Sequence, residues 1–229
     1  YDFVIFELSS YQLEYIKYLE SYISIILNLS QDHFERHKTY DEYFQTKLKI
    51  FKNSKFQIAN DLLDHQDKFM TFNIKDGHFF INKIKVDHLE YKQNTITYCK
   101  DVYKITGYHE AMNLCACLAI FKILNLSIKK IIKSFSKRKL LQHRVEEFYV
   151  FKGIKFINDS KSTNADSTRS ALKSISDNII LIMGGDKKEI SYKTLIELIN
   201  TKVKLLVIIG DNQDCLYEEL SVDIKKMCF

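Results

Sequence analysis

The chain has 229 residues, 46% of them hydrophobic and 13% aromatic, which is enough apolar material to fill one large core or two modest ones. Its formal net charge is only +5, and both signs are scattered along the sequence, so neither a nucleic-acid-binding stripe nor a polycationic tail is present. Five cysteines without a CxxC pair favour a reducing compartment, and the apolar runs are far shorter than the roughly 20 residues of a membrane span, so we expect a soluble protein.

The first half of the chain alternates apolar runs typical of strands with stretches whose apolar residues recur at helical spacing. Two of the helical stretches open with a capping box, a Ser or Thr followed three residues later by Gln or Glu. The sequence therefore predicts, in chain order, a strand at 3–6, a helix from Ser9 and Gln12 through Ile16, a strand at 23–29, and a helix from Thr39 and Glu42 to about Asn53.

Between residues 56 and 104 the apolar pattern shortens to a period of two, which predicts a small antiparallel patch with a turn at Asp76-Gly77. Two helices are predicted next, at 109–124 and 127–136. The periodicity then lapses into a basic, polar stretch at 137–142. We therefore place a domain boundary near Leu140, which gives domains 1–140 and 141–229.

The second half of the chain predicts a hairpin, with strands at 145–151 and 154–157 joined across Lys152-Gly153. Two buried strands follow, at 179–183 and 205–209, and helical stretches alternate with them. Alternating strands and helices indicate a parallel sheet with helices on its faces. The expected fold class is α/β in both domains.

Polar side chains in the first half fall where predicted strands end. Glu7 follows the first strand, and His33 lies shortly after the second. Ligands of open α/β sheets bind outside the carboxyl ends of strands, so we expect these side chains to meet. The plain alternatives are a solvated acid and a surface histidine. Zinc is disfavoured, because His33 and His37 lack the intervening glutamate of a zinc-protease helix.

Lys47 shares a predicted helical face with Tyr40, Tyr43 and Ile50, and we expect this face to turn inward. One interpretation is that the stem of the lysine lies along this apolar face while its charged end reaches water. The other is that desolvation lowers its pKa and leaves an amine that adds carbon dioxide, giving a carbamate suited to magnesium.

Two strand-to-helix turns in the second half are suited to anions. Residues 158–164, with the sequence NDSKSTN, lie between a strand and a helix that we expect to be capped by Thr163 and Asp166. A plain capped turn would not need Lys161. Residues 184–188, with the sequence GGDKK, follow the next strand, and their glycines permit close approach of a ligand to the backbone.

Taken together, these segments resemble the Mur ligase family, in the family's order and over nearly the whole chain. The resemblance rests on Glu7 with the run that follows it, Asp32-His33 with Lys47, His109 with Asn113, His143-Arg144, residues 158–164, and Gly184-Gly185-Asp186 with Lys188. Glu110 departs from the pattern, because asparagine is expected there. The fold that the resemblance implies is a central ATP-binding domain followed by part of a Rossmann-like ligase domain.

The resemblance implies a cytoplasmic, monomeric enzyme of cell-wall synthesis that uses ATP to add D-glutamate to UDP-N-acetylmuramoyl-L-alanine. Two magnesium ions would be held by Glu7, His33 and carbamylated Lys47, and His33, Lys47 and Lys161 would be catalytic. The implied ATP contacts are Asn113, Arg144 and Asp159, and the implied substrate contacts are Ser9, Thr163 and Lys188.

The sequence also departs from a complete enzyme of this family. The chain begins at Tyr1, contains no GxxxxGK[ST] phosphate loop and ends at Phe229 after a partial helical pattern, so we expect a piece truncated at both ends. Two alternatives stay open: a sister ligase of the folylpolyglutamate synthase type, and a noncatalytic nucleotide-binding relative.

Overall fold

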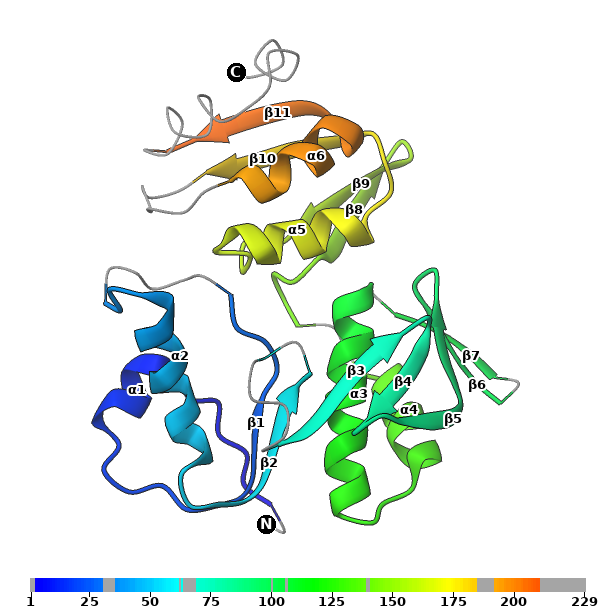
Figure 1. Cartoon of the computed structure of the whole chain (residues 1–229). Helices are drawn as coiled ribbons and strands as arrows, with labels where there is room; N and C mark the ends of the chain where they lie inside the picture. The colour runs from blue at the N-terminus through cyan, green and yellow to red at the C-terminus, as the bar shows by residue number, and fades with distance from the viewer. Residues whose placement is uncertain are drawn as a thin grey trace. The chain divides into compact units, whose positions relative to one another are not determined.

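A computed structural model describes residues 3–30, 36–61, 63, 69–99, 101–105, 107–138, 141–184 and 192–210. The chain divides into two compact units, the first formed mainly by residues up to Ser136 and the second mainly by residues from Lys137 onward (Figure 1). Residues 93–95 and 104–110 cluster with the second unit. In the described part of the chain, no helix is long and apolar enough to cross a membrane.

The first unit is built on a seven-stranded sheet in which the strands follow sequence order. β1, β2 and β3 run parallel, and β4 and β5 continue the sheet antiparallel. The sheet comprises β1 (Ser21–Ile26), β2 (Ser54–Asn60), β3 (Met70–Lys75), β4 (His78–Ile81), β5 (Ile84–Lys92), β6 (Thr95–Tyr98) and β7 (Asp101–Lys104). Asp76 and Gly77 join β3 to β4 with φ of 48° and 78°, the positive angles of a tight hairpin turn. The predicted combination of a parallel sheet and an antiparallel patch is confirmed, but the patch begins later than residue 56, because β2 and β3 still run parallel to β1.

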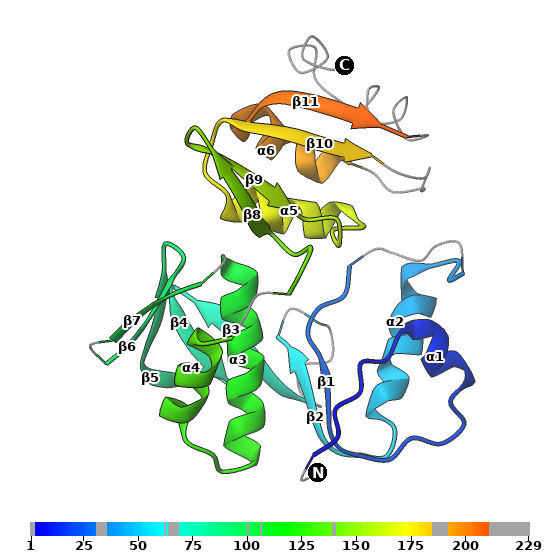
Figure 2. The ribbon, with the colours of Figure 1, turned by 180° about the vertical axis from the view of Figure 1, so that it is seen from behind.

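The helices of the first unit are α1 (Ser10–Tyr15), α2 (Tyr40–Leu48) with the 3₁₀ turn η1 (Lys49–Phe51), α3 (Tyr108–Ile123) and α4 (Ile128–Ser136). α2 packs Phe44 into a core with Ile26 of β1 and Ala59 of β2. α3 lies against β3 and β4 (Figure 2), where the Cys115 thiol donates to the carbonyls of Asn73 and Phe80. The helices therefore cover the sheet with apolar faces, as the sequence pattern predicts.

The strand predicted at residues 3–6 is wrong. The segment is not assigned to a strand, and its apolar side chains are 66% to 93% exposed. An apolar run becomes a strand only where a neighbour accepts and donates its backbone hydrogen bonds. Among the described residues, β1 pairs with β2 alone, and no strand lies at its other edge.

The second unit contains a hairpin and a separate parallel pair of strands. β8 (Glu146–Phe151) and β9 (Ile154–Asn158) are antiparallel, and Lys152 and Gly153 turn between them with φ of 47° and 80°. β10 (Ile179–Gly184) and β11 (Val203–Ile209) run parallel, with α6 (Lys193–Lys202) connecting them and α5 (Ala165–Ser174) preceding them. The hairpin and the two later strands lie where the sequence predicts them, but the predicted burial holds only for β11. In β10 no residue is fully buried, and Ile180 and Ile182 are 59% and 65% exposed, because the core covers only the other face of this strand.

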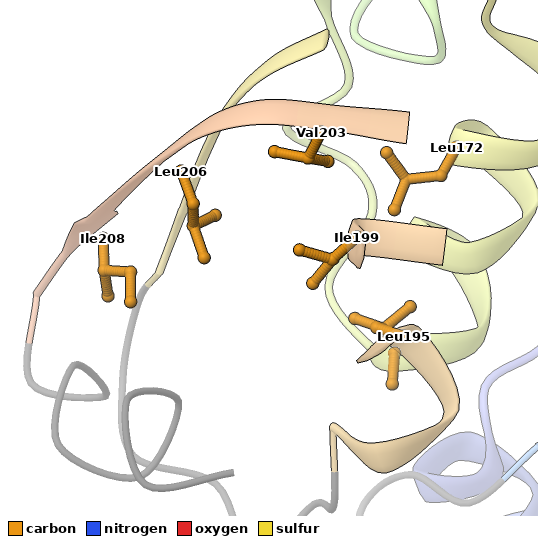
Figure 3. Packing of buried hydrophobic residues seen from close by; sticks show 7 residues of the cluster. Leu172, Leu195, Ile199, Val203, Leu206 and Ile208 are labelled. Atoms are coloured by element: carbon orange, nitrogen blue, oxygen red, sulfur yellow. The ribbon is translucent and has the colours of Figure 1, made fainter. Parts of the chain in front are cut away.

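The core of the second unit forms between the two helices and the parallel strands (Figure 3). Leu172 of α5, Leu195 and Ile199 of α6, and Leu206 of β11 are at most 2% exposed and belong to one cluster. Burying such side chains contributes on the order of 2 kcal/mol each. The second unit therefore has a hydrophobic core of its own.

The predicted cap of α5 is corrected by one position. Asn164, not Thr163, is the N-cap, and its side chain accepts from the backbone N–H of Ser167 at 2.9 Å. The Ser167 hydroxyl completes a capping box in place of Asp166. Asparagine caps helices at least as well as threonine, so the helix begins one residue later than the pattern of Thr163 and Asp166 predicts.

Candidate active site

Lys47 lies in the last turn of α2, and its side chain is half-buried. Three other residues of this helix, Tyr43, Phe44 and Thr46, are buried. Its Nζ donates to the carbonyl of Leu8 at 3.3 Å and lies 6.0 Å from the centre of the Tyr43 ring. Burial lowers the pKa of Lys47, and the nearby carboxylate of Glu7 opposes part of that shift. The amine therefore points to the segment before α1 instead of out along the surface.

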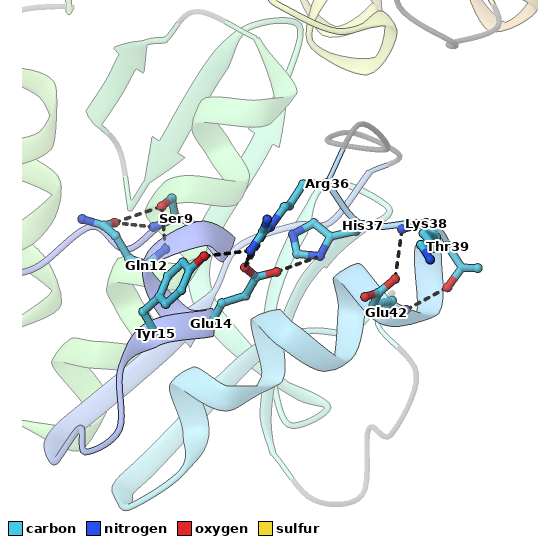
Figure 4. Close-up of polar contacts among 9 residues, drawn as sticks. All are labelled: Ser9, Gln12, Glu14, Tyr15, Arg36, His37, Lys38, Thr39 and Glu42. Atoms are coloured by element: carbon cyan, nitrogen blue, oxygen red, sulfur yellow. Dashed lines mark hydrogen bonds and ion pairs between the residues drawn. The ribbon is translucent and has the colours of Figure 1, made fainter.

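Glu7 and Ser9 lie in that segment, and both are exposed. Ser9 caps α1: its hydroxyl accepts from the Gln12 N–H at 3.2 Å, and Gln12 Oε1 accepts from the Ser9 N–H at 2.8 Å (Figure 4). The predicted substrate contact at Ser9 thus coincides with a capping role. The exposed Glu7 carboxylate is close enough to Lys47 to act on its amine electrostatically.

His33, Lys188 and Asp186 lie outside the described residues. The chain re-enters the described structure at Arg36 and His37, both of which contact α1. Arg36 donates to the Glu14 carboxylate at 2.7 and 3.0 Å, and His37 Nδ1 lies 3.6 Å from the other Glu14 oxygen. No group of three His, Cys, Asp or Glu side chains gathers as metal ligands in the described part of the chain.

Asn113 lies on α3 and is exposed, whereas its neighbours Met112 and Leu114 are buried. Its amide is therefore directed away from the hydrophobic core and is accessible to a ligand. Glu110, the departure from the family pattern, forms an ion pair with Arg138. This pair gives the unexpected carboxylate a structural partner.

In the second unit, the predicted ATP contact Asp159 joins two segments. Its Oδ1 accepts from the Val145 N–H at 2.9 Å, and its other oxygen accepts from the Ser162 hydroxyl. The Lys161 N–H donates to the His143 carbonyl at 3.1 Å. Arg144 lies between His143 and Val145, and both Arg144 and Lys161 are exposed, so these bonds present two cationic side chains from neighbouring segments.

The backbone around Arg144 is strained. His143 and Val145 have φ of 65° and 47°, a region that is unfavourable for a β-branched residue. Such strain persists only where surrounding contacts hold it, and it concentrates at functional sites. The bond from Val145 to Asp159 and the contact between His143 Nδ1 and Asn158 Nδ2 at 2.9 Å are two such contacts.

Two further residues of the predicted motifs, His109 and Thr163, also cluster with the second unit. Burial lowers the pKa of His109, while the charges of Glu110 and Asp159 raise it and those of Arg144 and Arg138 lower it. Thr163 is exposed and directly precedes the Asn164 cap of α5. Sequence reasoning missed Glu14, because nothing in its spacing marks a carboxylate that pairs with residues 22 and 23 positions away.

Comparison with known proteins gives the family. The Mur ligase middle domain model matches residues 1–121. The chain is 35% identical over 227 residues to the UDP-N-acetylmuramoylalanine--D-glutamate ligase of Fusobacterium nucleatum, covering 96% of this chain and 52% of that protein. It is 31% identical to the ligase of the same name from Alkaliphilus metalliredigens, covering 95% and 51%. The chain thus spans about half the length of the curated relatives it matches.

Solved structures share the fold at low sequence identity. MurF from Acinetobacter baumannii matches with a TM-score of 0.67 at 15% identity, covering 91% of this chain and 50% of that one. MurF from Thermotoga maritima, solved in complex with ADP, matches with a TM-score of 0.55 at 15% identity, covering 91% and 56%. With the family model matching more than half of its residues, this chain belongs to the Mur ligase family.

Proposed function

We propose that this chain is part of an ATP-dependent ligase that adds D-glutamate to UDP-N-acetylmuramoyl-L-alanine in peptidoglycan precursor synthesis. The names of the relatives with 31% to 35% identity support the substrate. The observation that carries the chemistry is the half-buried Lys47, with its lowered pKa and its amine at the carbonyl of Leu8 beside Glu7. A lysine whose only role is solubility is expected to hold its charged end in water instead.

The reaction that this function requires has two steps. The carboxylate of the UDP sugar substrate attacks the γ-phosphate of ATP, and an acyl phosphate and ADP form. The amine of D-glutamate then attacks the acyl carbon, and phosphate leaves as the amide bond forms. Both steps need negative charge neutralised and reactants aligned more than they need covalent help from the protein.

The chain's own residues fit a hard cation in part. Glu7 supplies a carboxylate oxygen, and a carbamate on Lys47 would supply a second anionic oxygen beside it; both are ligands that magnesium prefers. His33 is the third proposed ligand, by resemblance alone. Magnesium, when bound, would neutralise the charge that develops on the transferred phosphoryl group.

The other proposed roles follow the resemblance and the chemistry of each side chain. Lys161 would neutralise the acyl phosphate, and Arg144, Asn113 and Asp159 would contact ATP. Asp159 would do so from a position fixed by Val145 and Ser162. Thr163 and Lys188 would bind the D-glutamate carboxylates, and Ser9 would support the substrate near Glu7. We keep 1–140 and 141–229 as the proposed domains, in a cytoplasmic, monomeric enzyme.

The test is a ligation assay on the full-length gene product. We expect ADP and phosphate release only when ATP, magnesium, UDP-N-acetylmuramoyl-L-alanine and D-glutamate are all present, with the amide product seen by mass spectrometry. L-glutamate, diaminopimelate and a folate acceptor serve as competing substrates. Turnover with the folate acceptor would assign a folylpolyglutamate-type ligase, and ATP binding without any turnover would assign a noncatalytic relative.

A further inference from the structure

The polar ring of His37 is fully buried between α1 and α2, where an unpaired polar group is energetically unfavourable. Its ring centre lies 6.1 Å from that of Tyr11 on α1 and 5.3 Å from that of Tyr43 on α2. Among the described residues, neither ring nitrogen has a hydrogen-bond partner. Its Nδ1 lies 3.6 Å from Glu14 Oε1. A buried polar group without a hydrogen bond is unfavourable, so an apolar ring would serve better if packing were the only role.

Glu14 of α1 holds two successive residues with one carboxylate (Figure 4). Oε2 accepts from Arg36 Nε at 3.0 Å and from Nη2 at 2.7 Å, while Oε1 faces His37. Arg36 also donates to the hydroxyl of Tyr15 at 2.9 Å. A guanidinium that gives two donors to a carboxylate is held in a defined orientation as well as attracted. Glu14 thereby fixes α1 to the chain that enters α2.

The contact between α1 and α2 also affects the proposed site, because one candidate site residue lies just before α1 and another lies on α2. Glu7 lies three residues before the first residue of α1, and Lys47 lies in the last turn of α2 with Nζ on the Leu8 carbonyl. The separation of the Glu7 carboxylate from the Lys47 amine therefore depends on how α1 sits on α2. Glu14 and His37 act on this helix pair without being placed at the reacting atoms.

We propose that Glu14, through Arg36 and His37, is a positioning residue that sets the distance between Glu7 and Lys47, an inference that rests on the proposed ligase function. Removing a group that orients a metal ligand typically weakens metal binding about 10- to 100-fold. A merely structural ion pair would instead change the melting temperature and leave metal binding alone. The two roles are therefore separable by measurement.

The experiment compares wild type, Glu14→Gln and a matched control in the full-length gene product. Glu147→Gln is the control, because Glu147 also pairs with a cation at 2.7 Å, on the β8–β9 hairpin. Mn²⁺ binding is measured by electron paramagnetic resonance with a nonhydrolysable ATP analogue, and the Mg²⁺ requirement of ligation is measured separately. We expect Glu14→Gln to weaken Mn²⁺ binding about tenfold and to raise the Mg²⁺ requirement by a similar factor, with the control unchanged.

Wild-type Mn²⁺ binding and an unchanged Mg²⁺ requirement in folded Glu14→Gln would overturn the proposal. If this variant does not fold, His37→Phe decides, because phenylalanine keeps a ring between Tyr11 and Tyr43 but removes Nδ1. Weaker Mn²⁺ binding in His37→Phe supports positioning, and unchanged binding overturns it. If the wild type binds Mn²⁺ but forms no amide, the proposed function fails, while the Mn²⁺ data still decide the role of Glu14.

Discussion

Burial sets the chemistry of individual side chains in this protein. Lys47 and Cys115 are both withdrawn from water, and in both cases the uncharged form is favoured. For Lys47 that form is a nucleophilic amine beside Glu7. For Cys115 it is an inert thiol packed between α3 and the sheet. The same physical effect thus favours the neutral amine at Lys47 and the neutral thiol at Cys115.

The carbamate hypothesis for Lys47 predicts a sharp difference between two variants. Lys47→Ala should abolish ligation by the full-length protein, because an anionic oxygen ligand is lost where charge develops on the acyl phosphate. A short carboxylic acid should partly restore its turnover. Lys47→Arg should be equally inactive, since a guanidinium cannot form this ligand. The ligation rates of both variants are measured in saturating bicarbonate. Near wild-type activity of Lys47→Arg would contradict the carbamate hypothesis.

The lowered pKa of Lys47 also gives the carbamate a pH dependence. Only the neutral amine adds carbon dioxide, and a lysine with a lowered pKa is neutral at a lower pH than an exposed one. We expect a ¹³C NMR carbamate signal after addition of ¹³C-bicarbonate, and we expect it to persist to lower pH than in a peptide containing lysine. Lys47→Ala is the control, because it should lack the signal. A signal of equal size in that variant would assign the carbamate elsewhere.

Cys115 should resist alkylation in the folded protein. Burial raises the pKa of its thiol to about 12, so almost no thiolate is present at mildly alkaline pH. Exposed Cys99 offers the internal comparison. Brief treatment with iodoacetamide followed by peptide mass spectrometry should label Cys99 and spare Cys115 until denaturant is added. Equal labelling of both cysteines without denaturant would contradict the burial of Cys115.

At the scale of elements, helix α5 of the second unit is held at both ends by side chains. Asn164 caps the start of α5, and Lys202, at the end of α6, donates to two carbonyls at the end of α5, Leu172 at 3.0 Å and Ile175 at 2.7 Å. Helix ends leave backbone groups without partners inside the helix. These two residues satisfy such groups at opposite ends of α5.

Asn164→Ala should destabilise the second unit by about 1 kcal/mol, the usual effect of losing an N-cap. Thr163→Ala should cost less, because Thr163 is not the cap. Urea unfolding of both variants, followed by circular dichroism, measures the difference in the free energy of unfolding. A larger loss for Thr163→Ala than for Asn164→Ala would restore the cap that the sequence pattern alone suggests.

Lys202→Met should lower the free energy of unfolding by about 1.5 to 3 kcal/mol, the range for hydrogen bonds to a charged group. The substitution removes both hydrogen bonds but keeps an apolar side chain of similar length. Lys173→Met is the matched control, since Lys173 also lies in a last turn but is exposed. Both variants are compared by urea unfolding. Equal stability of the two would show that the bonds of Lys202 to the α5 carbonyls contribute nothing measurable.

The sequence predicts elements well where the signal is local. The capping box at Ser9 and Gln12, the Asp76-Gly77 turn and the helix at 109–124 depend on residues within a few positions of one another, and the structure has all three. The strand expected at residues 3–6 depends on a pairing partner that the run itself does not encode. The capping of α5 failed for another reason: Thr163 and Asn164 both suit the position, and pattern alone does not rank them.

At the scale of the whole molecule, motif order predicted the family, while long-range pairs stayed hidden. Glu7, Lys47 and Asp159 were proposed as site residues from their places after predicted strands and on a predicted helix face. Glu14 was not, because its partners Arg36 and His37 are brought to it only by the packing of α1 on α2. The candidate site residues thus stand in local patterns of the sequence, whereas the pairing of Glu14 with Arg36 and His37 does not.

The last prediction concerns the 229-residue chain expressed by itself, which should not form an amide bond. Its sequence contains no GxxxxGK[ST] loop, and it spans about half the length of the relatives it matches. A phosphate loop orients the γ-phosphate, and positioning supplies much of the catalysis in phosphoryl transfer. The assay is amide formation from ATP, UDP-N-acetylmuramoyl-L-alanine and D-glutamate, with the full-length gene product as the positive control. Amide formation by the 229 residues alone would require a second way of holding the γ-phosphate, and Lys161 with Arg144 would be the first pair to substitute in searching for it.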